Sequence, residues 1–152
     1  MKKTFFLLIF LPIFSFAQND KAEKEAVIAV IKQMFDGMRK GDSTMVRTAF
    51  ASQVRMQTIF MNKEGKPAIR AEDSVDGFVK AVGSPHPEIF DERIKDYDVK
   101  IDDRMAAVWT PYEFYLGEKF SHCGVNSFQL FRSEKGWRII QITDTRRKDG
   151  CR

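Results

Sequence analysis

The chain has 152 residues, of which 43% are hydrophobic and 30% are charged, and its formal net charge is +4. This length predicts one domain. Lysines and arginines are scattered among acidic residues and form no basic stripe, which excludes the usual signature of a nucleic-acid-binding surface. Beyond the N-terminal region, no apolar run is long enough to span a bilayer.

The N-terminal segment has the layout of a cleavable secretory signal. Two lysines precede an apolar run from Phe5 to Phe16, and small residues lie just before a cut after Ala17. The alternative is an uncleaved membrane anchor, but a spanning helix needs about 20 apolar residues. No cysteine lies near the cut, so the sequence does not indicate a bacterial lipoprotein anchor. We therefore expect a signal peptide over 1–17, a single domain over 18–152, and an exported protein that is periplasmic or secreted.

Two helices are predicted next. Apolar residues at helical spacing indicate an amphipathic helix over 18–40, which Gly41 ends. Asp42 or Ser43 can cap a short second helix that runs to about Phe50. A long helix, a break and a short helix are typical of a lid rather than of a bundle.

The rest of the chain is mostly β. Short strands are predicted at 55–61 and 67–71, followed by a third helix over 72–82 with valines on one face. An antiparallel meander then follows, with segments at about 90–102, 105–116, 120–131 and 136–145. Helices followed by a meander predict an α+β layout in which a curved sheet wraps around a helix.

Chemistry-bearing residues gather on one face of the central hairpin. A turn at Gly117-Glu118 places Glu113 opposite His122, and opposed residues share a face. One face then carries Trp109, Glu113, Tyr115, His122 and Asn126. The other, outer face carries Val108, Thr110, Tyr112, Phe114, Cys123 and Val125. Polar and aromatic groups on one face predict a pocket with an apolar wall.

Within that pocket, Glu113 and His122 are candidates for an acid–base pair, because a carboxylate raises the pKa of an imidazole and burial opposes it. The alternative is a satisfied polar pair with no function. The register of the last strand leaves two possibilities, since a slip of one residue exchanges the faces. We favour Asp144 and Arg146 in the pocket; the other set is Thr143, Thr145 and Arg147.

The two cysteines, Cys123 and Cys151, either form a disulfide in an oxidising compartment or remain free thiols. With only His86 and His122 beside them, the sequence gives little support for a zinc site. Nucleotide-binding and serine-hydrolase motifs are also missing, so no metal and no cofactor is expected.

Several blocks of the sequence resemble a known family. They are Thr110–Tyr115, Phe120–Gly124, Gly136–Ile139 and Asp144–Arg147, and the break at Gly41-Asp42 agrees with them. They are similar to small exported bacterial proteins called nuclear transport factor 2-like, or "putative lumazine-binding". The resemblance implies a cone-shaped curved antiparallel sheet around the N-terminal helix, with two further short helices. It also implies a superfamily of isomerases, cyclases, dehydratases and non-catalytic binders, often paired through the outer sheet face.

Three hypotheses follow. The first is an exported binder of a small, partly apolar, planar molecule. Its predicted ligand-binding residues are Trp109, Glu113, Tyr115, His122, Asn126, Asp144 and Arg146. The second is a cofactor-free isomerase, cyclase or hydrolase in which Glu113, with His122 or Asp144, is base and acid. The third is an interaction module that forms a homodimer through the apolar outer sheet face.

Overall fold

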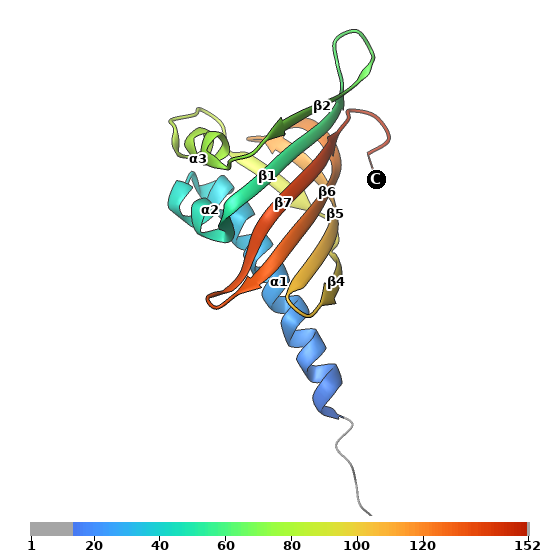
Figure 1. The fold of residues 1–152 in the computed structure, drawn as a ribbon. Helices are drawn as coiled ribbons and strands as arrows, with labels where there is room; N and C mark the ends of the chain where they lie inside the picture. The colour runs from blue at the N-terminus through green and yellow to red at the C-terminus, as the bar shows by residue number, and fades with distance from the viewer. Residues whose placement is uncertain (1–13, 152) are drawn as a thin grey trace, which may run out of the picture.

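The computed structural model describes residues 14–151. Three helices and seven strands follow one another in that range (Figure 1). In chain order they are α1 (Phe14–Lys40), α2 (Ser43–Ala49), β1 (Phe50–Met61), β2 (Pro67–Glu72), α3 (Asp76–Gly83), β3 (Phe90–Ile94), β4 (Asp98–Asp102), β5 (Met105–Leu116), β6 (Lys119–Ser133) and β7 (Gly136–Arg146).

The strands form one curved sheet in the order β2-β1-β7-β6-β5-β3, with β4 also paired to β5. All neighbours are antiparallel except β1 and β7, which run parallel. The predicted segment at 90–102 is two strands, because both β3 and β4 pair with β5 and the chain bends between them. Figure 1 shows the sheet curving around α1, so the predicted α+β fold is confirmed.

Helix α1 packs its apolar stripe into the concave face of the sheet. Val27, Ile31, Met34, Phe35 and Met38 are buried at the spacing of successive helical turns. The ring of Phe35 meets that of the β6 residue Phe128 edge-on, with centroids 6.1 Å apart. The apolar stripe predicted from the sequence is therefore the surface that closes the core.

The break after α1 forms as predicted. Gly41 has a φ of 67°, which favours glycine. Asp42 caps α2 by accepting a hydrogen bond from the backbone N–H of Met45 at 2.8 Å. A Cβ on Gly37 would lie 2.7 Å from the Val46 side chain, so the absence of a side chain there lets the two helices approach closely.

The predicted signal peptide, residues 1–17, lies mostly outside the described residues. No helix within residues 14–151 is both long enough and apolar enough to cross a membrane. Cleavage and export therefore stay predictions.

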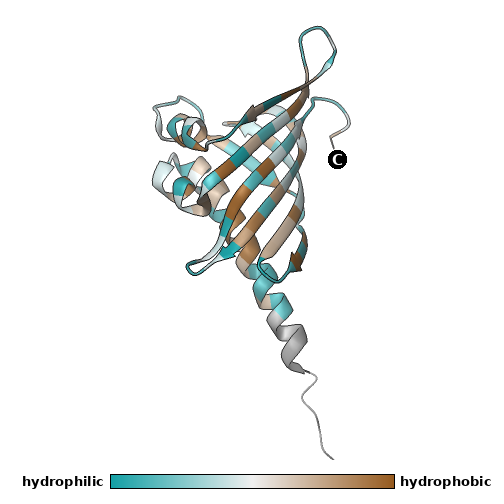
Figure 2. Ribbon diagram, in the orientation of Figure 1, coloured by the Kyte–Doolittle hydropathy of each residue, from teal (hydrophilic) through white to brown (hydrophobic). Residues whose placement is uncertain are grey.

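Apolar and polar residues alternate along the strands, as Figure 2 shows. The inward-facing apolar residues form a single core cluster that includes Phe128, Leu130 and Ile139. Trp137 is also buried there, and its indole N–H donates to the Glu23 carboxylate of α1 at 3.1 Å.

The central hairpin has a different register from the one predicted. Tyr115 pairs with Phe120, but Phe114 pairs with His122, so Ser121 is an extra residue on β6. This bulge lies immediately beyond the turn, and it shifts every later pair by one residue. Consequently Glu113 pairs with Cys123 rather than with His122.

Cys123 and Cys151 are joined by a disulfide, which decides between the two alternatives left by the sequence. The bond ties the C-terminal segment to β6. The backbones of Cys123 and Arg147 also exchange two hydrogen bonds of 2.9 Å. The last residues of the described chain are therefore anchored beside the open end of the sheet.

Candidate ligand-binding site

A cavity of about 230 Å³ lies between α1, α3 and the concave face of the sheet. Its walls are mainly apolar, with a polar group concentrated on the sheet side. The lining residues are Met34, Phe35, Met38, Met56, Phe78, Phe90, Glu92, Tyr112, Phe114, His122, Asn126, Phe128, Ile142, Asp144 and Arg146. An apolar wall with a few convergent polar groups is the usual composition of a small-molecule site.

One row of polar residues crosses five strands beneath this cavity. The cross-strand pairs join Arg70 to Thr58, Thr58 to Asp144, Asp144 to Asn126, and Asn126 to Thr110. Paired residues point to the same face, so the row places its side chains on the concave side. The inner face is mostly apolar, but at this one level each of the five strands carries a polar side chain, with Thr110 on β5 as the last of the row.

The carboxylate of Asp144 is the centre of this set. It is buried, and it accepts hydrogen bonds from the hydroxyl of Thr58 at 2.7 Å and from Nε of Arg146 at 2.8 Å. The hydroxyl of Tyr112 lies 3.4 Å from Oδ2 of Asp144, the oxygen that Arg146 also contacts. The same hydroxyl donates to the backbone oxygen of Thr145 at 3.0 Å. Burial and the nearby carboxylates raise the pKa of Tyr112, so its hydroxyl stays a proton donor.

Glu92 on β3 supplies a second acid to the cavity. Its carboxylate accepts a hydrogen bond of 2.7 Å from the side-chain amide of Asn126. Burial raises the pKa of Glu92 to about 7, and the negative charge of Asp144 acts in the same direction, while Asn126 and Arg146 oppose it. Near neutral pH this acid therefore exists in both protonation states.

His122 is a neutral member of the site. Burial, together with the positive charges of Arg146 and Lys148, lowers its pKa to about 4 against the opposing effect of Asp144. Its Nδ1 lies 3.0 Å from the hydroxyl of Ser121, and its ring lies 5.0 Å from the ring of Phe114, centroid to centroid. The uncharged ring can donate or accept one hydrogen bond at each nitrogen, depending on the tautomer.

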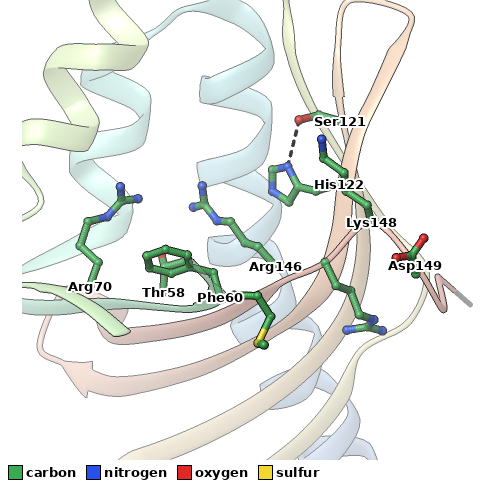
Figure 3. Close-up of a pocket in the computed structure, with 10 residues that line it drawn as sticks. Thr58, Phe60, Arg70, Ser121, His122, Arg146, Lys148 and Asp149 are labelled. Carbon is green, nitrogen blue, oxygen red and sulfur yellow. Dashed lines mark hydrogen bonds between the residues drawn. The ribbon is translucent and has the colours of Figure 1, made fainter. Parts of the chain in front are cut away.

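A second, wider space of about 500 Å³, shown in Figure 3, adjoins the cavity and shares His122 and Arg146 with it. We use "mouth" for the space lined by Thr58, Phe60, Met61, Arg70, Ser121, His122, Arg146, Arg147, Lys148 and Asp149. In Figure 3 the side chains of Arg70, Arg146 and His122 rise from the sheet on the same side. Four of these lining residues are cationic and one is acidic.

The structure brings together four of the seven predicted ligand-binding residues. His122, Asn126, Asp144 and Arg146 all line the cavity. The favoured choice of register for the last strand therefore agrees with the structure. Whether these residues bind a ligand stays a prediction.

The other three predicted residues lie elsewhere. The side chain of Trp109 is on the outer face of the sheet and is 54% exposed. Glu113 also faces outward, where Nζ of Lys95 donates to it at 2.6 Å and the Tyr115 hydroxyl at 3.1 Å. These hydrogen bonds lower the pKa of the Glu113 carboxyl. The predicted Glu113–His122 pair is wrong, because the bulge at Ser121 turns the two side chains to opposite faces.

The predicted outer face needs the same correction. Val108, Thr110 and Tyr112 are buried on the inner side, and Phe114 lines the cavity. The exposed apolar side chains of the outer face instead include Ile59, Ile69, Met105, Trp109 and Phe131. A homodimer through this face stays a prediction, now with different residues.

Sequence reasoning missed Glu92, Arg70 and Tyr112. For Glu92 a usable signal exists, since the alternation Phe90, Glu92, Ile94 places an acid on the same side of a strand as two apolar residues. Tyr112 was assigned to the wrong face together with its strand. Arg70 lies on a short edge strand with mostly exposed residues, where the pattern gives no signal.

Several solved structures have the same fold as this chain. A nuclear transport factor 2-like protein with a cystatin-like fold from Novosphingobium aromaticivorans superposes with a TM-score of 0.74 at 10% identity, covering 94% of this chain and 93% of that one. The beta subunit of a "putative aromatic-ring-hydroxylating dioxygenase" from the same species gives 0.69 at 14% identity, covering 84% and 91%. A "putative ketosteroid isomerase" from Shewanella frigidimarina gives 0.58 at 17% identity, covering 78% and 94%. At these identities the likeness shows the fold alone.

The family follows from the sequence itself. The model of the family described as "Putative lumazine-binding" matches residues 22–143. The chain belongs to this family, and its fold is that of nuclear transport factor 2-like proteins, so the resemblance noted from the sequence is confirmed. Among proteins with curated functions, none matches the chain.

Proposed function

We propose that this protein binds a small, partly apolar molecule in the cavity of its cone, outside the cytoplasm. The observation that carries the proposal is the polar set of Glu92, Asn126 and Asp144 at the sheet side of an otherwise apolar cavity. Buried polar groups normally lie in satisfied networks away from open space. Here they border a cavity, where a ligand can exchange hydrogen bonds with them.

Two further observations support parts of this proposal. The family description names lumazine, a small planar heterocycle, as a ligand, and a planar molecule fits between aromatic walls such as Phe35 and Phe90. Export is supported by the layout of residues 1–17 and by the disulfide between Cys123 and Cys151, because disulfides persist in oxidising compartments.

Native mass spectrometry of the purified protein, followed by titration with lumazine, tests the proposal. Met56 lines the cavity from β1, and Ile59 lies on the outer face of the same strand. Met56→Trp should fill the cavity and abolish any co-purified mass or lumazine binding, whereas Ile59→Trp should leave it unchanged. Equal binding by wild type and by Met56→Trp would show that the cavity is not the site.

A proton-transfer enzyme is the second candidate function, and the pKa of Glu92 favours it. A carboxyl with a pKa of about 7 is suited to general acid–base catalysis at neutral pH. This replaces Glu113 in the earlier hypothesis with an acid that does face the cavity.

The test for this second candidate is deuterium incorporation into enolisable ketones in heavy water, followed by NMR. Glu92→Gln keeps the size of the side chain and an oxygen that can accept from Asn126. A catalytic Glu92 predicts exchange with wild type and none with the variant. Ketones that bind without any exchange would argue against catalysis.

A further inference from the structure

The charges of the site are unevenly distributed between its two spaces. The acids Glu92 and Asp144 line the cavity together with one cation, Arg146. The mouth has four cationic lining residues, Arg146 among them, and a single acid, Asp149. No carboxylate within residues 14–151 lies within ion-pair distance of Lys148, and the acid nearest to Arg70 is Glu72 at 4.0 Å. A molecule entering the cavity therefore passes a positively charged rim.

The orientation of Arg146 is set by its neighbour. Its Nε donates to Oδ2 of Asp144 at 2.8 Å. The hydroxyl of Thr58 donates to Oδ1 of the same carboxylate at 2.7 Å. The guanidinium has five donors in a rigid fork. With Nε engaged, the terminal nitrogens of Arg146 have no acceptor within the described residues, and Figure 3 shows them directed into the mouth.

Arg70 approaches the same space from the edge strand. It pairs with Thr58 across β1 and β2, so it lies in the polar row that contains Asp144. Its side chain lines both the mouth and the adjoining hollow beside α3. Two guanidinium groups on one side of the sheet form a recognition element for planar or tetrahedral oxyanions.

We propose that the ligand of this cavity is an amphipathic oxyanion, with its apolar body among the aromatic walls and its carboxylate or phosphate held between Arg70 and Arg146. This inference rests on the proposed binding function and names the chemical class of the ligand. His122 supports it, because the ring is uncharged and can donate one hydrogen bond at the rim. Asp144 holds Arg146 in place and compensates part of its charge, while Arg70 and Lys148 leave the mouth with an excess of positive charge.

The experiment compares four probes that share one apolar body: phenylbutyrate, phenylbutanamide, phenylbutylamine and phenylbutyl phosphate. Isothermal titration calorimetry with wild type should show tighter binding of the two oxyanions than of the amide, and the amine should bind least. A charge-assisted hydrogen bond contributes enough to make this difference about tenfold or more. The order of the two oxyanions distinguishes a carboxylate ligand from a phosphate ligand.

Variants locate the effect. Arg70→Gln should weaken oxyanion binding by about tenfold and leave amide binding unchanged. Arg146→Lys keeps the charge but loses the fork, so it should weaken the oxyanions by a smaller factor. Arg55→Gln is the matched control, because Arg55 is an exposed arginine on the outer face of β1 with a weak contact to Asp73 at 3.8 Å.

The outcomes separate this inference from the proposed function. Equal affinity for acid and amide, with both lost in Met56→Trp, would overturn the oxyanion assignment and leave the cavity as a binding site. Unchanged oxyanion binding in Arg70→Gln and Arg146→Lys would overturn it as well. If no probe binds, the oxyanion inference is overturned, and the lumazine titration still decides the proposed function. If Met56→Trp binds all the probes as wild type does, both the inference and the proposed function are wrong.

Discussion

Replacing Glu92 by glutamine should stabilise the protein at alkaline pH and have much less effect at acidic pH. The folded state holds this carboxyl in a cavity with a neighbouring Asp144, and both burial and that negative charge disfavour the ionised form. Glutamine has nearly the same shape, is always neutral, and still offers an oxygen to Asn126.

The magnitude follows from the pKa. Burial raises the pKa of Glu92 from its ordinary value of 4.5 to about 7 in the folded protein. Between these values the folded state binds more protons than the unfolded state, so the free energy of unfolding decreases as pH rises. One pKa unit corresponds to about 1.4 kcal/mol, so ionised Glu92 costs the folded state about 3 kcal/mol once the pH exceeds 7.

Urea denaturation followed by circular dichroism at about pH 5 and about pH 8 measures this cost. Glu92→Gln should exceed wild type by about 3 kcal/mol at the higher pH and by well under half of that at the lower pH. Glu118→Gln, in the exposed turn between β5 and β6, is the control and should show no such pH-dependent difference. A gain that is independent of pH, or a variant that is less stable only at high pH, would refute the reasoning.

Three other predictions concern the C-terminal half. Cys151→Ser opens the bridge to Cys123 across a sequence separation of 28 and should lower the free energy of unfolding by about 3 kcal/mol; an unchanged urea midpoint would contradict this. Gly124→Ala should destabilise the fold by about 3 kcal/mol or more, because the new Cβ would lie 1.7 Å from the backbone oxygen of Thr145; a variant that melts like wild type would show that the strands can move apart. The ring carbon signals of His122 should not titrate by NMR above about pH 5, since its pKa is lowered to about 4; a midpoint near neutral pH would mean that the ring is more hydrated than described.

The fold was predictable because its signals are local and periodic. Helix α1 follows from its apolar spacing, Gly41 and Asp42 mark the break, and the alternation of β5 to β7 gives a meander. These features depend on a few neighbouring residues each. The family resemblance added the cone, and the match over residues 22–143 confirms the family.

The site was only half predictable because it depends on register. Counting from the turn at Gly117 assumes equal numbers of residues on both strands, and the extra Ser121 breaks that assumption. A bulge leaves the period of the sequence pattern unchanged on either side of it. His122 and Asn126 nevertheless reach the cavity, whereas Glu113 turns outward and its place as the cavity acid is taken by Glu92, from a strand distant in sequence.

The start of helix α1 and the mouth lie at opposite ends of the molecule. The helix begins at Phe14, whereas its hydrogen bond to the sheet is at Glu23 and its buried stripe starts at Val27, and Figure 1 shows its first turns projecting past the sheet. The mouth is at the other end, beside the C-terminal segment and the ends of β1 and β7 (Figure 1). Anything coupled to the start of α1, whether a surface, a tag or a membrane anchor, would therefore leave the mouth facing away from it and accessible to solutes.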